Sequence, residues 1–287
     1  MELLLLIFPG LPLFSAFVTY LLFWYESRVD GHILVIRRLS GGRTLYWALY
    51  SFLTAAASQT LVIALFALQF VQGWWLPSRR SGKTPPVILV HGLYHNSSAW
   101  LFFSRRLARR GFTDLHAVNY NSFSVDYEQI IERIDKKFEK LRAERPSDMR
   151  VVLIGHSLGG LAIRGWLSKS ENAGRALAVV TLGTPHKGSK VAGLGIGSLA
   201  RSLMHRGKLI KNIEAGEKPP PCPALSVFTP MDNMVIPTEN LHIDVPGWRE
   251  KSVEPISHVA MLYSTNTVDA CVDFIQEVVT GSRQTLK

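Results

Sequence analysis

Residues 149–160 read MRVVLIGHSLGG and carry the strongest structural signal in the chain. An apolar run that ends in glycine is typical of a strand buried on both faces of a parallel sheet. The serine that follows lies between Gly155 and Gly159, in the pattern Gly-x-Ser-x-Gly. A turn from strand to helix is too tight there for side chains at the flanking positions, and it lifts the hydroxyl above the sheet edge. The stretch therefore predicts that Ser157 is a nucleophile at the start of a helix.

The alternation of strand and helix continues on both sides of this stretch. Short apolar runs predict further strands at 86–92, 113–120, 176–182 and 224–229. Helices are predicted over 98–110, over 124–145, from residue 157 and at the carboxyl terminus. Within 124–145 the apolar residues share one helix face: Tyr127, Ile130, Ile131, Ile134, Phe138 and Leu141. Repeated strand–helix units predict an α/β fold with a mostly parallel sheet covered by helices on both faces.

A serine nucleophile needs a base, and the base needs a carboxylate that orients it. For a serine on such a turn the chain order is serine, acid, histidine. His258 lies in a loop just before the last helix, where it can reach back over the sheet edge, so we expect it to be the base. Asp232 follows the strand at 224–229 directly and is the expected acid. Asp244, inside an apparent strand around 241–243, is the alternative.

Two backbone N–H groups are needed to bind the oxyanion that forms during acyl transfer. Leu158, directly after the nucleophile, is one expected donor. The loop after the first strand begins His91-Gly92-Leu93, and Leu93 is the other expected donor because Gly92 allows a close approach of the backbone. His91 could act as a second base, but we expect it to shape this loop through hydrogen bonds.

The amino-terminal quarter has a different composition. Residues 3–25 and 44–78 contain no charged side chain, and each run exceeds the roughly 20 residues that span a bilayer. The start lacks a basic region and a cleavage site, so it does not resemble a signal peptide. We therefore predict a two-helix transmembrane anchor over 1–73, with the second span within 45–72, and a globular domain over 74–287. Four arginines in the linker 26–43 slightly favour a cytoplasmic linker and a globular domain outside.

Net charge and cysteine content limit the classes of partner. The chain carries 32 Lys and Arg against 22 Asp and Glu, a net charge of +10. This charge suits anionic lipid headgroups, and the sequence contains no signature of a nucleic-acid-binding fold. Two cysteines provide no disulfide framework and no Cys-rich zinc site. Cys222 and Cys271 could pair, although Cys271 lies on the apolar stripe of its helix and is more simply explained as a core residue.

Residues 187–221 interrupt the strand–helix rhythm, and the segment is too long for a simple connection. It contains a glycine-rich GLGIGS stretch and an amphipathic stretch. Four apolar residues in it are candidates to dip into a membrane interface and uncover Ser157: Leu194, Ile196, Leu199 and Leu203.

Together these residues resemble a known family. His91-Gly92 after a strand, the run 155–160, Asp232 with Val235 and Pro237, and His258 resemble the α/β-hydrolase fold. The stretch 183–189, GTPHKGS, resembles a motif of bacterial triacylglycerol lipases and lipase-like esterases. The resemblance covers about residues 84–281. It implies Ser157 as nucleophile, Asp232 as acid, His258 as base, Leu93 and Leu158 as oxyanion donors, and 187–221 as a lid or cap.

Taken with the predicted anchor, which departs from secreted lipases, the resemblance implies a membrane-anchored serine hydrolase that cleaves carboxylic esters, in particular lipid acyl esters, at a bacterial inner membrane. No acidic pair near His258 reproduces the calcium site of some secreted lipases, so no metal and no cofactor are expected. An acyltransferase or a thioesterase would use the same three residues, because the acceptor site is a shape rather than a motif. The remaining alternative is a non-enzymatic membrane scaffold. The presence of all three residues of the expected triad, Ser157, Asp232 and His258, argues against it. The sequence leaves the oligomeric state open.

Overall fold

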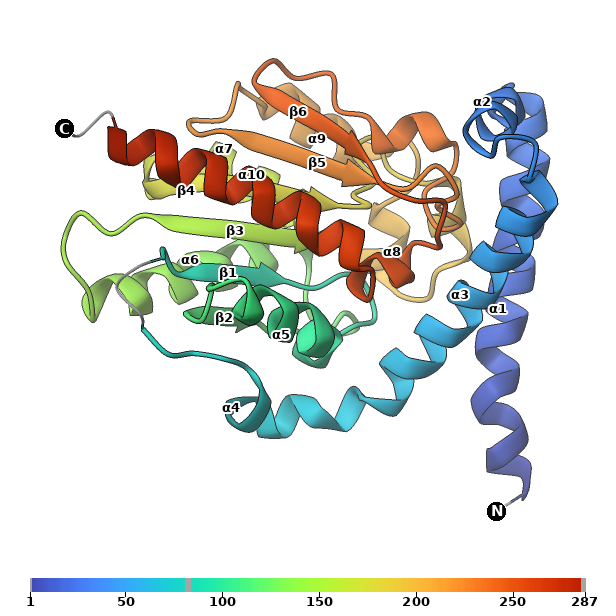
Figure 1. Ribbon diagram of the computed structural model, residues 1–287, viewed down its shortest axis with the longest axis horizontal. Helices are drawn as coiled ribbons and strands as arrows, with labels where there is room; N and C mark the ends of the chain where they lie inside the picture. Colours follow the sequence, from blue (N-terminus) through green and yellow to red (C-terminus); the bar gives the residue numbers. More distant parts are fainter. Residues whose placement is uncertain (1, 81–83, 285–287) are drawn as a thin grey trace.

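The structure is a computed structural model that describes residues 2–80 and 84–284, with side chains from residue 10 to residue 282. Its centre is a six-stranded sheet in the order β2-β1-β3-β4-β5-β6, in which every neighbouring pair is parallel (Figure 1). The strands are β1 (Val87–Val90), β2 (Leu115–Val118), β3 (Val151–His156), β4 (Ala176–Leu182), β5 (Ala224–Phe228) and β6 (Trp248–Ser252). All carboxyl ends therefore meet at one edge of the sheet.

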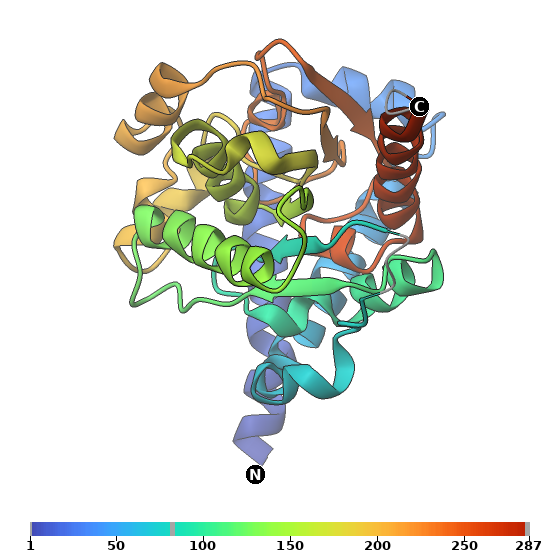
Figure 2. The same ribbon diagram turned by 90° about the vertical axis from the view of Figure 1, so that its left-hand side faces the viewer.

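Helices cover both faces of this sheet, as Figure 2 shows in a view along the strands. One face packs on α5 (Leu101–Arg109) and α10 (Thr265–Gln284), and the other on α6 (Tyr127–Ala143) and α7 (Leu158–Lys169). Short 3₁₀ helices complete the connections: η2 (Ser97–Trp100), η3 (Ala173–Arg175), η5 (Thr238–Leu241) and η6 (Val259–Leu262). The predicted α/β architecture is confirmed, and so is the apolar face of α6, whose six predicted residues are all buried.

The five predicted strands are present, most of them shorter by one to four residues at their ends. Two details of the prediction are wrong. The apparent strand around 241–243 is the end of η5 and a loop, so Asp244 lies in a loop. The sixth strand, β6, lies at one edge of the sheet and was not predicted because most of its side chains are exposed. A solvated edge strand has no apolar pattern to reveal it.

The two cysteines do not pair. Both are free and buried, and they belong to separate core clusters on opposite faces of the sheet: Cys271 packs with α10 and α5, and Cys222 packs with α6 and α7. Side chains on opposite faces of one sheet cannot reach disulfide distance.

Residues 2–75 form five helical pieces: α1 (Glu2–Val29), α2 (His32–Leu39), α3 (Thr44–Ala64), η1 (Phe66–Val71) and α4 (Gln72–Trp75). Figure 1 shows α1 and α3 standing across the carboxyl ends of the strands. A small apolar core joins the two parts, because Tyr20 and Phe23 of α1 pack with Met231 and Ile236 from the loop after β5. The helices are therefore packed on the globular domain rather than held away from it.

The prediction of two membrane spans is supported for one helix only. Among the described residues, α3 alone is long and apolar enough to cross a bilayer, with 22% of its best window buried. The linker between the predicted spans also contacts the globular domain. Glu26 forms an ion pair with Lys190, and His32 Nε2 lies 2.9 Å from the carbonyl oxygen of Pro230. Two complete crossings would put linker and domain on opposite sides of the membrane, so these contacts argue against that topology.

The segment 187–221 folds into η4 (Lys190–Leu194), α8 (Ser198–Ser202) and α9 (Lys208–Gly216). Leu194 and Ile196 are exposed, as their predicted role requires. Leu199 and Leu203 are buried in the core beside α7, so the prediction that they reach a membrane interface is wrong. The apolar side of this amphipathic stretch faces the protein and not solvent.

Candidate active site

Ser157 lies on the turn between β3 and α7 and has an unusual backbone conformation, with φ 55° and ψ −122°. Residues other than glycine rarely adopt a positive φ, so this backbone conformation stores strain. Tight packing imposes it. A Cβ on Gly155 would lie 2.6 Å from the backbone of Gly159, and a Cβ on Gly159 would lie 2.1 Å from the carbonyl oxygen of Val90. The glycines are required because backbone occupies the space of their side chains, as the sequence pattern predicted.

Asp232 and His258 form a buried pair at the carboxyl edge of the sheet. Asp232 lies in the loop after β5, which we call the acid loop (residues 229–236). His258 lies in the loop before η6, the histidine loop (residues 254–258). The Nδ1–H of His258 donates to Oδ2 of Asp232 at 2.7 Å. The other carboxylate oxygen accepts the backbone N–H groups of Met234 and Val235, each at 2.9 Å. These bonds leave the carboxylate one orientation, aimed at the histidine ring.

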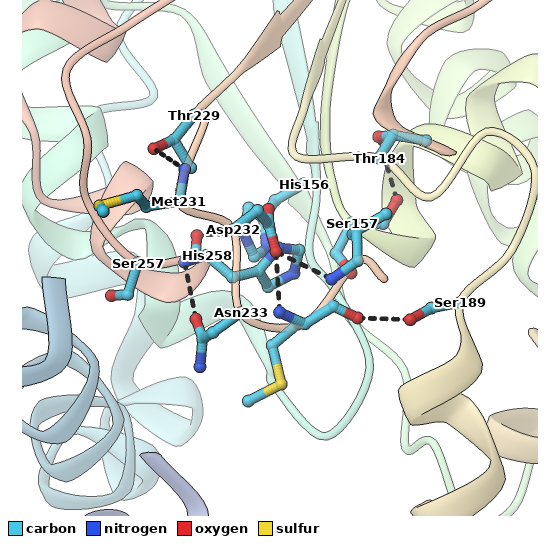
Figure 3. Close-up of polar contacts among 12 residues, drawn as sticks. His156, Ser157, Thr184, Ser189, Thr229, Met231, Asp232, Asn233, Ser257 and His258 are labelled. Carbon is cyan, nitrogen blue, oxygen red and sulfur yellow. Dashed lines mark hydrogen bonds and ion pairs between the residues drawn. The ribbon is translucent and has the colours of Figure 1, made fainter. Parts of the chain in front are cut away.

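Ser157 lies near the same pair (Figure 3). The N–H of Ser157 donates to the carbonyl oxygen of Leu182 at 2.8 Å. The next residue, Gly183, adjoins the pair, because a Cβ on it would lie 3.1 Å from both Asp232 Oδ2 and His258 Nδ1. The ring of His156 lies 4.7 Å from that of His258. The three predicted residues thus come together from β3, the acid loop and the histidine loop. Ser157 is partly exposed, while Asp232 is fully buried and His258 is 5% exposed.

The alternative acid lies elsewhere. Asp244 has an exposed side chain and forms an ion pair with Lys187 at 2.7 Å. The other histidines after the serine also have different partners. His186 is buried beside Arg164 and Ser226, and His205 and His242 contact Asn240 and Glu250. Geometry therefore favours Asp232 and His258 over the competing residues.

The backbone N–H groups of both expected oxyanion donors lack a hydrogen-bond acceptor in the described part of the chain. Leu158 is the first residue of α7, so its N–H has no intrahelical acceptor. His91 is buried, with Nδ1 2.9 Å from the carbonyl oxygen of Gly92 and Nε2 accepting the N–H of Tyr120 at 3.2 Å. Both ring nitrogens are engaged, which agrees with a role in shaping the loop and not with a second base.

Burial keeps the neighbouring histidines neutral. It lowers the pKa of His91 to about 4, against which hydrogen bonds act only partly. The pKa of His95 falls to about 3, mainly through burial and then through repulsion from His91 and His258. Burial also lowers the pKa of His156, and a charge on His258 lowers it further. His91, His95 and His156 are therefore expected to carry no positive charge near neutral pH.

Sequence reasoning missed several residues that hold the site. Asn233 accepts the backbone N–H of His258 at 3.2 Å through Oδ1. Thr184 donates to the carbonyl oxygen of Ser157 at 3.1 Å. Thr54 of α3 accepts the backbone N–H of Ser257 at 3.2 Å. For Thr54 the available signal was a hydroxyl residue within an otherwise apolar helix.

Short stretches of the chain are similar in sequence to two plant methylesterases. A stretch of 92 residues, 31% of the chain, is 29% identical to Methylesterase 17 of Arabidopsis thaliana and spans 33% of that protein. A stretch of 83 residues is 32% identical to Methylesterase 3 from the same plant and spans 31% of it. The chain thus spans about a third of the methylesterases that it matches.

Solved structures share the fold at low sequence identity. The mature lipase of Bacillus licheniformis gives a TM-score of 0.56 at 17% identity, over 69% of this chain and 94% of that one. A membrane phospholipase A, described as a bacterial virulence factor, gives 0.52 at 15% identity, over 88% of this chain and 99% of that one. Residues 87–269 match the sequence model of the Alpha/beta hydrolase family. This match covers more than half of the chain, from the first strand into the last helix, and the chain therefore belongs to the alpha/beta hydrolase family.

Proposed function

We propose that this protein hydrolyses carboxylic esters through a Ser157 acyl-enzyme. The observation that carries the proposal is the arrangement of a strained, partly exposed serine beside a buried histidine–carboxylate pair. Esters are also the substrates that the names of the similar methylesterases, lipase and phospholipase indicate.

In the proposed reaction the Ser157 hydroxyl attacks the acyl carbonyl while Nε2 of His258 accepts its proton. Asp232 orients the imidazole through Nδ1 and stabilises the imidazolium. The backbone N–H groups of Leu93 and Leu158 bind the oxyanion. Collapse of the tetrahedral intermediate transfers the proton from His258 to the departing alcohol and leaves an acyl-serine. Water, deprotonated by His258, then attacks the ester, releases the carboxylic acid and regenerates Ser157.

The surroundings of the serine favour a lipid substrate. We call the loop after β1 (residues 91–96) the oxyanion loop. Exposed apolar side chains from three segments gather near it: Tyr94, Phe123, Leu194 and Ile196. The rings of Tyr94 and Phe123 stack at 5.3 Å. The Tyr94 hydroxyl donates to the carbonyl oxygen of Ile196 and accepts its N–H, both at 2.7 Å. These bonds join the segment 187–221 to the oxyanion loop, and we propose that this segment is the lid.

We further propose that the amino-terminal helices hold the enzyme at a bilayer through their outer faces. Large apolar side chains are exposed along them: Leu11, Phe14, Phe17 and Leu21 on α1, and Leu45, Leu49 and Leu53 on α3. An apolar patch of this extent on an isolated protein marks a contact surface. Because their opposite faces pack on the hydrolase domain, the arrangement fits helices that lie within one leaflet better than two full crossings.

Labelling with a fluorophosphonate probe tests the chemistry. The wild type in detergent should be labelled, Ser157→Ala should not be, and Ser168→Ala, which alters an exposed serine on α7, should be labelled at the wild-type rate. Turnover is then measured on short soluble esters, on thioesters and on phospholipid vesicles, with and without an alcohol acceptor. Labelling that persists in Ser157→Ala would disprove the nucleophile. Preferred transfer to the alcohol or preferred thioester cleavage would replace hydrolysis with the alternative reactions, and failure to float with vesicles would disprove the membrane contact.

A further inference from the structure

We infer that α1 and α3 are positioning elements of the active site, and that hydroxyl groups on their inner faces hold the acid loop and the histidine loop in register. This inference rests on the proposed function. It assigns Thr54 and Tyr20 as positioning residues, together with Ser51 and Thr19, although none of them reaches Ser157.

The hydrogen bonds of α3 to the loop backbone are with the histidine loop. Thr54 Oγ1 accepts the backbone N–H of Ser257 at 3.2 Å and lies 3.3 Å from the Ser257 hydroxyl. One turn earlier, the Ser51 hydroxyl donates to the carbonyl oxygen of Pro255 at 2.9 Å. These two bonds hold the backbone on the amino-terminal side of His258. Figure 3 shows Ser257 on the side of the site that faces the amino-terminal helices, drawn in blue.

The contacts of α1 are with the acid loop. The Tyr20 hydroxyl donates to the carbonyl oxygen of Met231 at 3.1 Å, one residue before Asp232. Thr19 Oγ1 accepts the side-chain N–H of Asn233 at 2.7 Å, one residue after it. The oxygen of the same Asn233 amide accepts the N–H of His258. A continuous chain of bonds therefore runs from α1 through Asn233 to the backbone of the histidine.

Burial makes these bonds necessary. Ser51 is fully buried, and Thr19 and Tyr20 are at most 5% exposed. A buried polar group without a partner is costly, so a helix in a different position would leave these hydroxyls and the loop backbone unsatisfied. Apolar packing of Ala55 and Phe23 with Met231 closes the same junction. The two helices and the two loops are therefore expected to keep one relative position.

The reaction depends on this position. Asp232 and His258 come from different loops, and their 2.7 Å contact exists only while both loops are held. Small misplacements of reacting groups lower rates strongly, even when the altered residue is remote. None of the four hydroxyls lines the apolar rim around Tyr94 and Ile196. Loss of a hydroxyl should therefore lower kcat and leave KM for a small soluble ester unchanged.

Three variants of α3 in the full chain test this inference. Thr54→Val keeps the shape of the side chain and removes the hydroxyl, whereas Thr54→Ser keeps the hydroxyl. Thr60→Val is the matched control, because the Thr60 hydroxyl donates to Ala56 of its own helix at 2.8 Å. We expect kcat on a short soluble ester and the rate of fluorophosphonate labelling to fall about tenfold or more in Thr54→Val. Thr54→Ser should restore both rates, and Thr60→Val should match the wild type.

Tyr20→Phe provides a second test that removes a single oxygen atom, should Thr54→Val fail to fold. It should lower kcat in the same way with an unchanged KM. Wild-type kcat in both Thr54→Val and Tyr20→Phe, with Ser157 still labelled, would overturn the inference and leave the proposed function intact. A wild type that is neither labelled nor active would instead overturn the proposed function. A fall in labelling rate that Thr54→Ser does not restore would also count against the positioning role.

Discussion

The strained backbone of Ser157 gives a stability prediction that is independent of substrate. At φ 55° and ψ −122° a residue with a Cβ atom stores about 1–3 kcal/mol of strain, which glycine relieves. Glycine in turn loses about 0.5–1 kcal/mol more conformational entropy on folding. Ser157→Ala and Ser157→Gly both remove the hydroxyl, so their comparison isolates the backbone. We expect Ser157→Gly to be more stable than Ser157→Ala by about 1 kcal/mol.

The assay is thermal unfolding of the full chain in one detergent at one pH. A difference of about 1 kcal/mol corresponds to roughly 2–4 °C in Tm for a protein of this size. The same pair of substitutions at Lys136 is the control, because that exposed residue lies in the middle of the regular helix α6. There the order should reverse, since glycine is about 1 kcal/mol worse than alanine inside a helix. Equal Tm values for the two Ser157 variants, or a less stable Ser157→Gly, would refute the argument from strain.

Two further predictions concern the acid and the response to pH. Asp232→Asn should lower kcat on a soluble ester by about three to four orders of magnitude, since an amide favours the wrong tautomer of His258. Asp244→Asn should retain nearly full activity. If steady-state kinetics showed the reverse order, Asp244 would be the acid. Burial holds the pKa of His91 at about 4, below its ordinary value of 6.5, so the unfolded chain takes up the proton first as pH falls, and folding stability decreases between pH 6.5 and 4. At pH 5 the buried His91 should lower the free energy of unfolding by about 2 kcal/mol relative to neutral pH. The unfolding midpoint should therefore fall less between pH 7.5 and pH 5 in His91→Asn than in the wild type. An equal fall in both proteins would contradict the assignment.

The local pattern of the chain was sufficient for most of the hydrolase domain. Apolar runs revealed five of the six strands, since a strand buried on both faces needs an apolar side chain at nearly every position. The glycines around Ser157 revealed the turn because backbone atoms fill the space of any larger side chain. Chain order then indicated Asp232 and His258, which the folded chain places 2.7 Å apart. The exposed edge strand β6 lacked such a pattern and was missed.

The position of the amino-terminal helices was decided by tertiary structure alone. Their lack of charge suggested a membrane anchor, and composition cannot distinguish a helix in lipid from one packed on a protein with its other face exposed. Thr54 bonds to a residue 203 positions away, and Tyr20 to one 211 positions away. Contacts between such distant positions depend on how whole elements pack, and a single hydroxyl in an apolar helix does not specify its partner. In the folded protein the two helices close against the loops that carry Asp232 and His258.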